Sequence, residues 1–122
     1  MDWLTDALKE ELLTAGKRQA EADARAESCA LPILTCLRLS GSSWLLASVC
    51  PDDPDMAYGL CHVAGGVPEL GYIRLSELAG LRNSNGIGVF EDPMFKNADR
   101  LDVRRYADMA AITGQIALHY TY

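Results

Sequence analysis

The stretch that decides the fold runs from Trp44 to Leu78 and reads WLLASVCPDDPDMAYGLCHVAGGVPELGYIRLSEL. Its three apolar runs have the composition and alternation of β-strands, and two turns separate them. The first turn is the acidic sequence PDDPD at residues 51–55, and the second is GGVP at residues 65–68. Proline presets the backbone angle of a turn, and aspartate bonds back to nearby amides. We therefore predict three successive strands, over residues 44–50, 56–63 and 70–75.

Two further strands flank this stretch. Residues 31–39 predict a strand that pairs antiparallel with 44–50, because only a short GSS turn separates the two runs. Residues 44–46 are apolar on both faces, as expected of an interior strand. Gly59 predicts a bulge or a close approach of two backbones. After an NSNG turn, residues 87–90 predict a short edge strand.

The N-terminal region predicts an amphipathic helix. Apolar residues recur at helical spacing over residues 2–15, with Asp2 or Thr5 as the cap. Gly16, followed by two basic residues, is a stop signal. Residues 17–30 are rich in alanine and mixed charges, so they form either a solvated helix or a loose linker.

Two more helices are expected later in the chain. Ser76 is an N-cap for a short helix that extends to Arg82. Asp99 or Asp102 caps a final helix that ends near Gly114.

The order helix, four strands, helix, strand, helix predicts an α+β fold with a largely antiparallel sheet of about four to five strands. The short turns between strands lead us to expect the helices on one face of that sheet. The 122 residues correspond to a single globular domain, residues 1–122. A chain of this length can bury a sizeable core without a metal or a disulfide.

The charge balance bears on the choice of partner. Seventeen acidic and eleven basic residues give a net charge of −6, which repels a phosphate backbone and disfavours direct nucleic-acid binding. The same charge suits a protein with a basic groove, including one that normally holds nucleic acid. A net charge of this size is also ordinary for solubility alone.

The cysteines and the N-terminal sequence bear on the compartment. The start of the chain, MDWLTD, resembles no secretory signal, and no apolar run is long enough to span a bilayer. Cys36, Cys50 and Cys61 lie within apolar, strand-like runs, where a free cysteine behaves as a small buried hydrophobe. We therefore expect reduced thiols, a cytoplasmic protein and no membrane association.

The acidic turn is the densest group of carboxylates, with Asp52, Asp53 and Asp55. It lacks the glycine and the distal glutamate of a calcium-binding loop. Cys61 and His62 lack the spacing of zinc ligands, and adjacent strand residues point to opposite faces. No nucleophile motif or phosphate-binding loop is present. We expect no metal, no cofactor and no catalytic residues.

Two motifs carry a resemblance to a known family. They are PxDPDxAYGLC at residues 51–61 and PELGYIRLSEL at residues 68–78, and they resemble a bacterial family catalogued as domain of unknown function 2958. The chain departs from the family pattern at His62, usually Asp, and at Arg74, usually Ser. The resemblance implies no established reaction. It does imply a context, because members look like cargo of plasmids, conjugative elements and prophages.

These observations lead to one leading hypothesis and two alternatives. The leading hypothesis is a non-enzymatic interaction protein that blunts host defence, such as an anti-CRISPR inhibitor binding the basic surface of a CRISPR effector. The first alternative is a small metal-dependent hydrolase that uses the acidic turn, Glu69 and His62. The second is an accessory or regulatory protein of the mobile element, for which a homodimer is a compatible state. The candidate partner-binding residues are Asp52, Asp53 and Asp55, joined by Glu69, Glu91 and Asp92 if the turns cluster.

Overall fold

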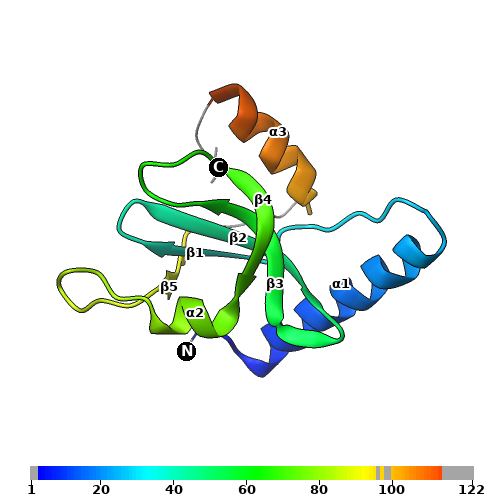
Figure 1. Cartoon of the computed structure of the whole chain (residues 1–122), viewed down its shortest axis with the longest axis horizontal. Helices are drawn as coiled ribbons and strands as arrows, with labels where there is room; N and C mark the ends of the chain where they lie inside the picture. The colour runs from blue at the N-terminus through cyan, green and yellow to red at the C-terminus, as the bar shows by residue number, and fades with distance from the viewer. Residues whose placement is uncertain (1–2, 96, 98–99, 114–122) are drawn as a thin grey trace.

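The computed structural model describes residues 3–95, 97 and 100–113 of the chain (Figure 1). Its elements are α1 (Asp6–Ala24), β1 (Thr35–Leu39), β2 (Ser42–Cys50), β3 (Asp53–His62), β4 (Glu69–Arg74), α2 (Leu75–Gly80), β5 (Phe90–Glu91) and α3 (Val103–Thr113). All strand pairs are antiparallel, and the five-stranded sheet has the order β4-β3-β2-β1-β5. The predicted α+β fold is therefore confirmed. None of the helices within the described residues combines the length and the apolar character needed to span a bilayer.

Strand β2 is the centre of the core. Every residue from Ser43 to Val49 is buried, which confirms the interior strand expected from its apolar character on both faces. Trp44 and Leu46 point into one apolar cluster, and Leu45 and Ala47 point into another. A strand of this kind needs cover on both sides of the sheet.

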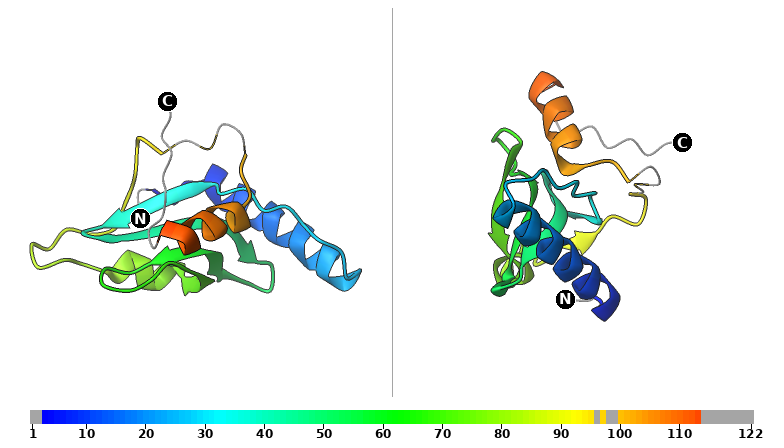
Figure 2. Two further views of the ribbon diagram at one scale, coloured as in Figure 1. Left: turned by 90° about the horizontal axis from the view of Figure 1, so that it is seen from above. Right: turned by 90° about the vertical axis from the view of Figure 1, so that its right-hand side faces the viewer.

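The helices provide that cover from both sides, so the expectation of helices on one face was wrong. Leu75 and Leu78 of α2 belong to the cluster of Trp44, whereas Val103 and Tyr106 of α3 belong to the opposite cluster. Figures 1 and 2 show α2 and α3 on opposite sides of the sheet. Turn lengths constrain which strands are neighbours, but they leave open the face on which a helix packs.

The N-terminal helix does not stop at Gly16. Thr5 accepts a hydrogen bond from the amide of Leu8 at 3.1 Å and caps α1, which then continues to Ala24 and extends beyond the end of the sheet (Figure 2). Gly16 is buried against β2, where a Cβ atom would lie 1.8 Å from the carbonyl oxygen of Val49. The glycine is thus required by close packing of two backbones, and the predicted break was wrong. Of the 17–30 segment, residues 17–24 are helical.

A bulge in β2 sets which residues face each cluster. Leu46 pairs with Gly59 but Ser48 pairs with Tyr58, so Ala47 is an extra residue in β2. The bulge shifts the alternation, and Val49 therefore returns to the cluster of Trp44. Opposite the bulge, a Cβ on Gly59 would lie 2.0 Å from the carbonyl oxygen of Leu45, which confirms the predicted close approach.

Two strands begin later than predicted. β1 begins at Thr35, because the backbone of residues 31–33 bonds instead to the segment before α3, with Ile33 donating to the Leu101 carbonyl at 3.2 Å. The edge strand is Phe90–Glu91, because the side chain of Asn83 accepts from two amides of its own loop, including that of Ile87 at 2.9 Å. The Asn83 turn itself is confirmed.

The predicted caps of the later helices had mixed outcomes. Asp102 caps α3 by accepting from the amide of Arg104 at 2.7 Å. Ser76 lies inside α2, whose N-cap is Arg74, so the predicted Ser76 cap was wrong. The alternative caps Asp2 and Asp99, and the helix end near Gly114, lie outside the described residues.

Gly16→Ala is expected to destabilise the protein, although alanine stabilises an exposed helical position by about 1 kcal/mol relative to glycine. The new methyl group collides with the Val49 carbonyl, and overpacking of this kind costs about 1–3 kcal/mol. Urea denaturation followed by circular dichroism measures the free energy of unfolding. Gly80→Ala is the matched control, because a Cβ there meets nothing within 4 Å. A Gly16→Ala protein as stable as the wild type would contradict the close packing of α1 on β2.

Candidate functional site

The acidic turn is mostly bound to the protein itself. β3 begins at Asp53, so Asp53 and Asp55 are strand residues and only Asp52 remains in the turn. Arg74, at the end of the neighbouring strand β4, donates to Asp53 at 3.1 Å and lies 3.6 Å from Asp55. Two of the three aspartates therefore neutralise one arginine, and a free cluster of three carboxylates does not form.

Asp55 also organises the start of α2. One carboxylate oxygen accepts from the Ser76 amide at 3.0 Å, and the other accepts from the Ser76 hydroxyl at 2.7 Å. These bonds do for α2 what a side-chain cap does for a helix, although the acceptor comes from another strand. The bond from the Ser76 hydroxyl is the main cause that lowers the pKa of Asp55.

The other candidate carboxylates lie in different places. Glu69 begins β4 opposite Cys61, at the far end of β3 from Asp53. Glu91 pairs with Leu37 in β5, at the opposite edge of the sheet from β4. Glu69 and Glu91 therefore do not cluster with the acidic turn, as the predicted partner-binding surface required.

Glu91 and Asp92 also have partners of their own. Glu91 accepts a short hydrogen bond from the hydroxyl of Thr35. Asp92 is 9% exposed and accepts from Arg38 at 2.7 Å and from the Met94 amide at 2.8 Å. These two carboxylates hold the β5 edge in place. Of the six candidates, Asp52 and Glu69 are the exposed ones whose carboxylates bond to no other described residue.

A pair of tyrosines lies on the hairpin of β3 and β4 that follows the acidic turn, and the sequence reasoning missed it. Tyr58 and Tyr72 are cross-strand partners on β3 and β4, with ring centroids 5.0 Å apart. Tyr72 is 57% exposed. The signal was present in the sequence, because a hairpin centred on Gly65 pairs residue 58 with residue 72. Burial, and then the nearby Cys50, Tyr58 and Asp23, raise the pKa of the Tyr72 hydroxyl.

A groove of about 520 Å³ adjoins Tyr58. It lies between the C-terminal end of α1 and the start of α3, and Asp23, Glu27, Tyr58 and Asp102 are among its lining residues. Asp102 already accepts from two amides, including that of Leu31 at 2.6 Å. Asp23 and Glu27 are exposed and are therefore the carboxylates of this groove that a ligand can reach.

We call the residues Asp23, Glu27, Asp52, Tyr58 and Tyr72 the acidic tyrosine surface. Asp23 and Cys50 both lie near enough to Tyr72 to act on its hydroxyl, and Asp52 lies two residues after Cys50, in the turn between β2 and β3. The surface combines carboxylates with aromatic rings that are already partly ordered by their contact with each other. Tyrosine is enriched at protein interfaces because it supplies contact area and a hydrogen-bonding group together.

The described residues offer little for nucleophilic or metal chemistry. Burial raises the pKa of Cys36 to about 12 and that of Cys61 to about 11, so both thiols are protonated at neutral pH. The Nε2 atom of His62 lies 3.1 Å from the carbonyl oxygen of Gly66 in its own turn. Within the described residues, no three histidine, cysteine or carboxylate side chains gather in a way that could hold a metal ion.

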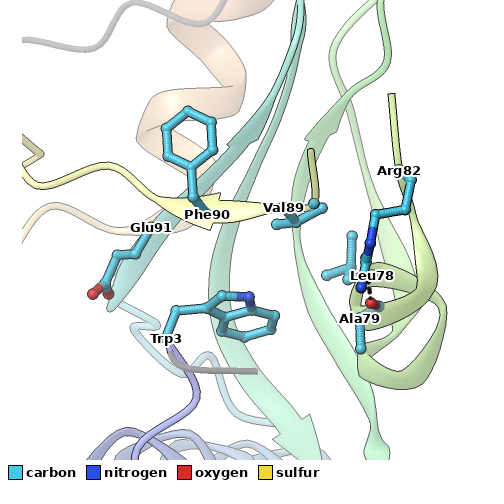
Figure 3. A pocket seen from close by; sticks show the side chains of 8 residues that line it. Trp3, Leu78, Ala79, Arg82, Val89, Phe90 and Glu91 are labelled. Carbon is cyan, nitrogen blue, oxygen red and sulfur yellow. Dashed lines mark hydrogen bonds between the residues drawn. The ribbon is translucent and has the colours of Figure 1, made fainter. Parts of the chain in front are cut away.

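A second hollow, of about 480 Å³, lies between α2 and β5 (Figure 3). Figure 3 shows the Arg82 guanidinium turned toward the backbone of Ala79, to whose carbonyl it donates at 2.8 Å. Glu91, at the other side, is bonded to Thr35. The two charged side chains that line this hollow therefore bind other parts of the protein and stabilise the fold.

Asp55→Ala is expected to lower stability at neutral pH, because α2 loses its acceptor and Arg74 loses one of its two partners. A lowered pKa in the folded state means that the contribution is complete above the ordinary carboxylate range and is lost as the pH falls through the lowered value. Urea midpoints of the wild type and Asp55→Ala should therefore differ at pH 7 and converge in acid.

The matched control is Asp52→Ala, which removes a neighbouring carboxylate that bonds to no other described residue. Its urea midpoint should stay close to that of the wild type at every pH. A difference between Asp55→Ala and the wild type that is unchanged through the acid range would contradict the role assigned to the Asp55 carboxylate.

Comparisons with known proteins give a family and no function. No curated protein and no solved structure matches the chain. A family model described as "Protein of unknown function (DUF2958)" matches residues 3–117. That match covers most of the chain and includes the eight helices and strands of the described residues. The chain belongs to the DUF2958 family of proteins of unknown function.

Proposed function

We propose that this chain is a non-enzymatic interaction protein whose acidic tyrosine surface binds a basic surface of another protein. The observation that carries the proposal is the exposed Tyr72 ring, which lies tilted against Tyr58 and close to Asp23. Asp52 is a further exposed carboxylate, in the turn that follows Cys50. Aromatic anchors at the centre of an interface supply much of its binding energy. Carboxylates around them favour lysine- and arginine-rich partners over acidic ones.

The charge of the whole chain supports the same kind of partner. A net charge of −6 attracts a basic protein over distances set by the ionic strength, and it repels nucleic acid. Asp53 and Asp55 contribute less than their number suggests, because Arg74 balances part of their charge. The proposed surface therefore replaces them with Asp23 and Glu27, both of which are exposed. Glu27 makes only a long ion pair, 3.8 Å, with the exposed Arg25.

The wider role that we propose is inhibition of a host defence system on behalf of a mobile element, with an anti-CRISPR inhibitor as the leading case. The support is the family context together with the acidic surface, which suits a host protein whose groove normally holds nucleic acid. Occupation of such a groove by carboxylates and tyrosines would block its normal ligand without any chemical step.

The test is affinity capture from a host that carries an active CRISPR system. The tagged wild-type chain is expected to capture a host protein with a basic surface, and binding should weaken as salt is raised. Asp23→Lys combined with Asp52→Lys should reduce capture by at least about tenfold, since it reverses two charges at the interface. These residues are a better choice than Asp53 and Asp55, whose reversal would disturb Arg74 and α2.

The matched control combines Glu10→Lys with Glu77→Lys, which makes the same change in net charge at exposed positions outside the acidic tyrosine surface. Capture by this control should equal that of the wild type. Tyr72→Ala should reduce capture without any change in net charge. Undiminished capture by the Asp23/Asp52 variant and by Tyr72→Ala would refute the surface, and a defence system that stays fully active would refute the wider role.

A further inference from the structure

Strand β4 forms an edge of the sheet that is open to pairing. It bonds to β3 on one side, and no other described strand pairs with it. Its residues, Glu69–Arg74, include no proline and no lysine, which are the usual means of protecting an edge strand. The other edge of the sheet is protected by its shortness, because β5 has two residues.

The same strand exposes two large apolar side chains on one face. Leu70 is 38% exposed and Tyr72 is 57% exposed. Their cross-strand partners, Leu60 and Tyr58, belong to the cluster beneath α3, so Leu70 and Tyr72 lie on that side of the sheet. Apolar side chains beside unpaired backbone groups favour the addition of another strand.

We propose that the β4 edge pairs with the β4 edge of a second copy of this chain, antiparallel and centred on Gly71. A two-fold axis perpendicular to the sheet leaves the same face of both copies on the same side. Directly opposed residues must therefore both have even numbers or both have odd numbers. With Gly71 at the centre, Leu70 of each copy lies opposite Tyr72 of the other copy, so this pair forms twice. Glu69 then lies opposite Ile73. The apolar pairs meet on one face, and the strand is complementary to itself.

The neighbouring registers fit less well. Centring on Tyr72 would place Leu70 opposite Arg74, whose guanidinium is bound to Asp53 and Asp55. Centring on Leu70 would place Tyr72 opposite Pro68, which has no amide hydrogen to give to a ladder. With Gly71 at the centre, Arg74 keeps its own ion pairs, and the two Glu69 carboxylates lie at opposite ends of the interface.

The proposal also predicts the character of the dimer. Five paired residues per copy form a small interface, so the association is reversible. Each copy carries a net charge of −6, so the two copies repel each other and added salt should strengthen the dimer. This salt dependence is opposite to that expected for binding a basic partner, and the proposal does not rest on the proposed function.

The first test is analytical ultracentrifugation of the whole chain over micromolar to submillimolar concentrations. The expected mass rises from 13.3 kDa toward twice that value, and it does so at lower protein concentrations in high salt. Leu70→Lys should weaken the dimer by at least about tenfold, because a charge at an edge strand opposes pairing. It also makes the chain less negative, so general repulsion could not explain the loss. Ile87→Lys is the matched control, since Ile87 is exposed outside β4 and carries the same change of charge.

The second test is a cross-link that reads the register. A Cβ at Gly71 meets nothing within 4 Å, and directly opposed residues of antiparallel strands have Cα atoms about 4.5–5.5 Å apart, which suits a disulfide. Gly71→Cys should therefore form a covalent dimer on mild oxidation, whereas Tyr72→Cys should not. Circular dichroism confirms that each variant is folded. A chain that stays monomeric, a dimer that Leu70→Lys leaves intact, or a dimer in which Gly71→Cys fails to cross-link would overturn the proposal.

Discussion

The structure depends on the close contact between the backbone of α1 at Gly16 and the backbone of β2 at Val49. No side chain fits between the two, so the helix lies directly against the central strand, beyond the point where β1 leaves it. This contact lets α1 continue to Ala24 and brings Asp23 within electrostatic reach of Tyr72. The proximity of Tyr72 to the available carboxylate of Asp23 is thus a consequence of how α1 packs on β2.

The carboxylates of the chain divide into two groups that composition alone cannot distinguish. Asp53, Asp55 and Asp92 accept hydrogen bonds from arginines or from helix and loop amides, so each contributes to the fold. The carboxylates of Asp23 and Asp52 are exposed and accept no such hydrogen bonds from other described residues. The net negative charge of the chain therefore overstates the number of carboxylates that a partner can bind. The acidic turn that dominates the sequence supplies a single available carboxylate.

Much of the fold was predictable, because alternation of apolar residues and turn chemistry act over a few neighbouring positions. The buried β2 and the Asn83 turn are examples. The errors arose where a distant residue decides the outcome. In the sequence, Gly16 resembles a helix stop, but its role is to pack closely against Val49. Ser76 resembles an N-cap, but Asp55 of another strand accepts from the amide there. For the site, Asp52 was recognised, but Asp23 was not, since only the packing of α1 brings it near the tyrosines.

The measurement that tests this account most directly is a ¹⁵N nuclear magnetic resonance titration of the chain with a lysine- and arginine-rich peptide. The account predicts amide shifts at Asp23, Asp52, Tyr58 and Tyr72 that disappear at high salt, with little change in α2 and β5. Shifts concentrated on α2 and β5, or no shifts at low salt, would contradict the claim that the acidic tyrosine surface recognises basic partners.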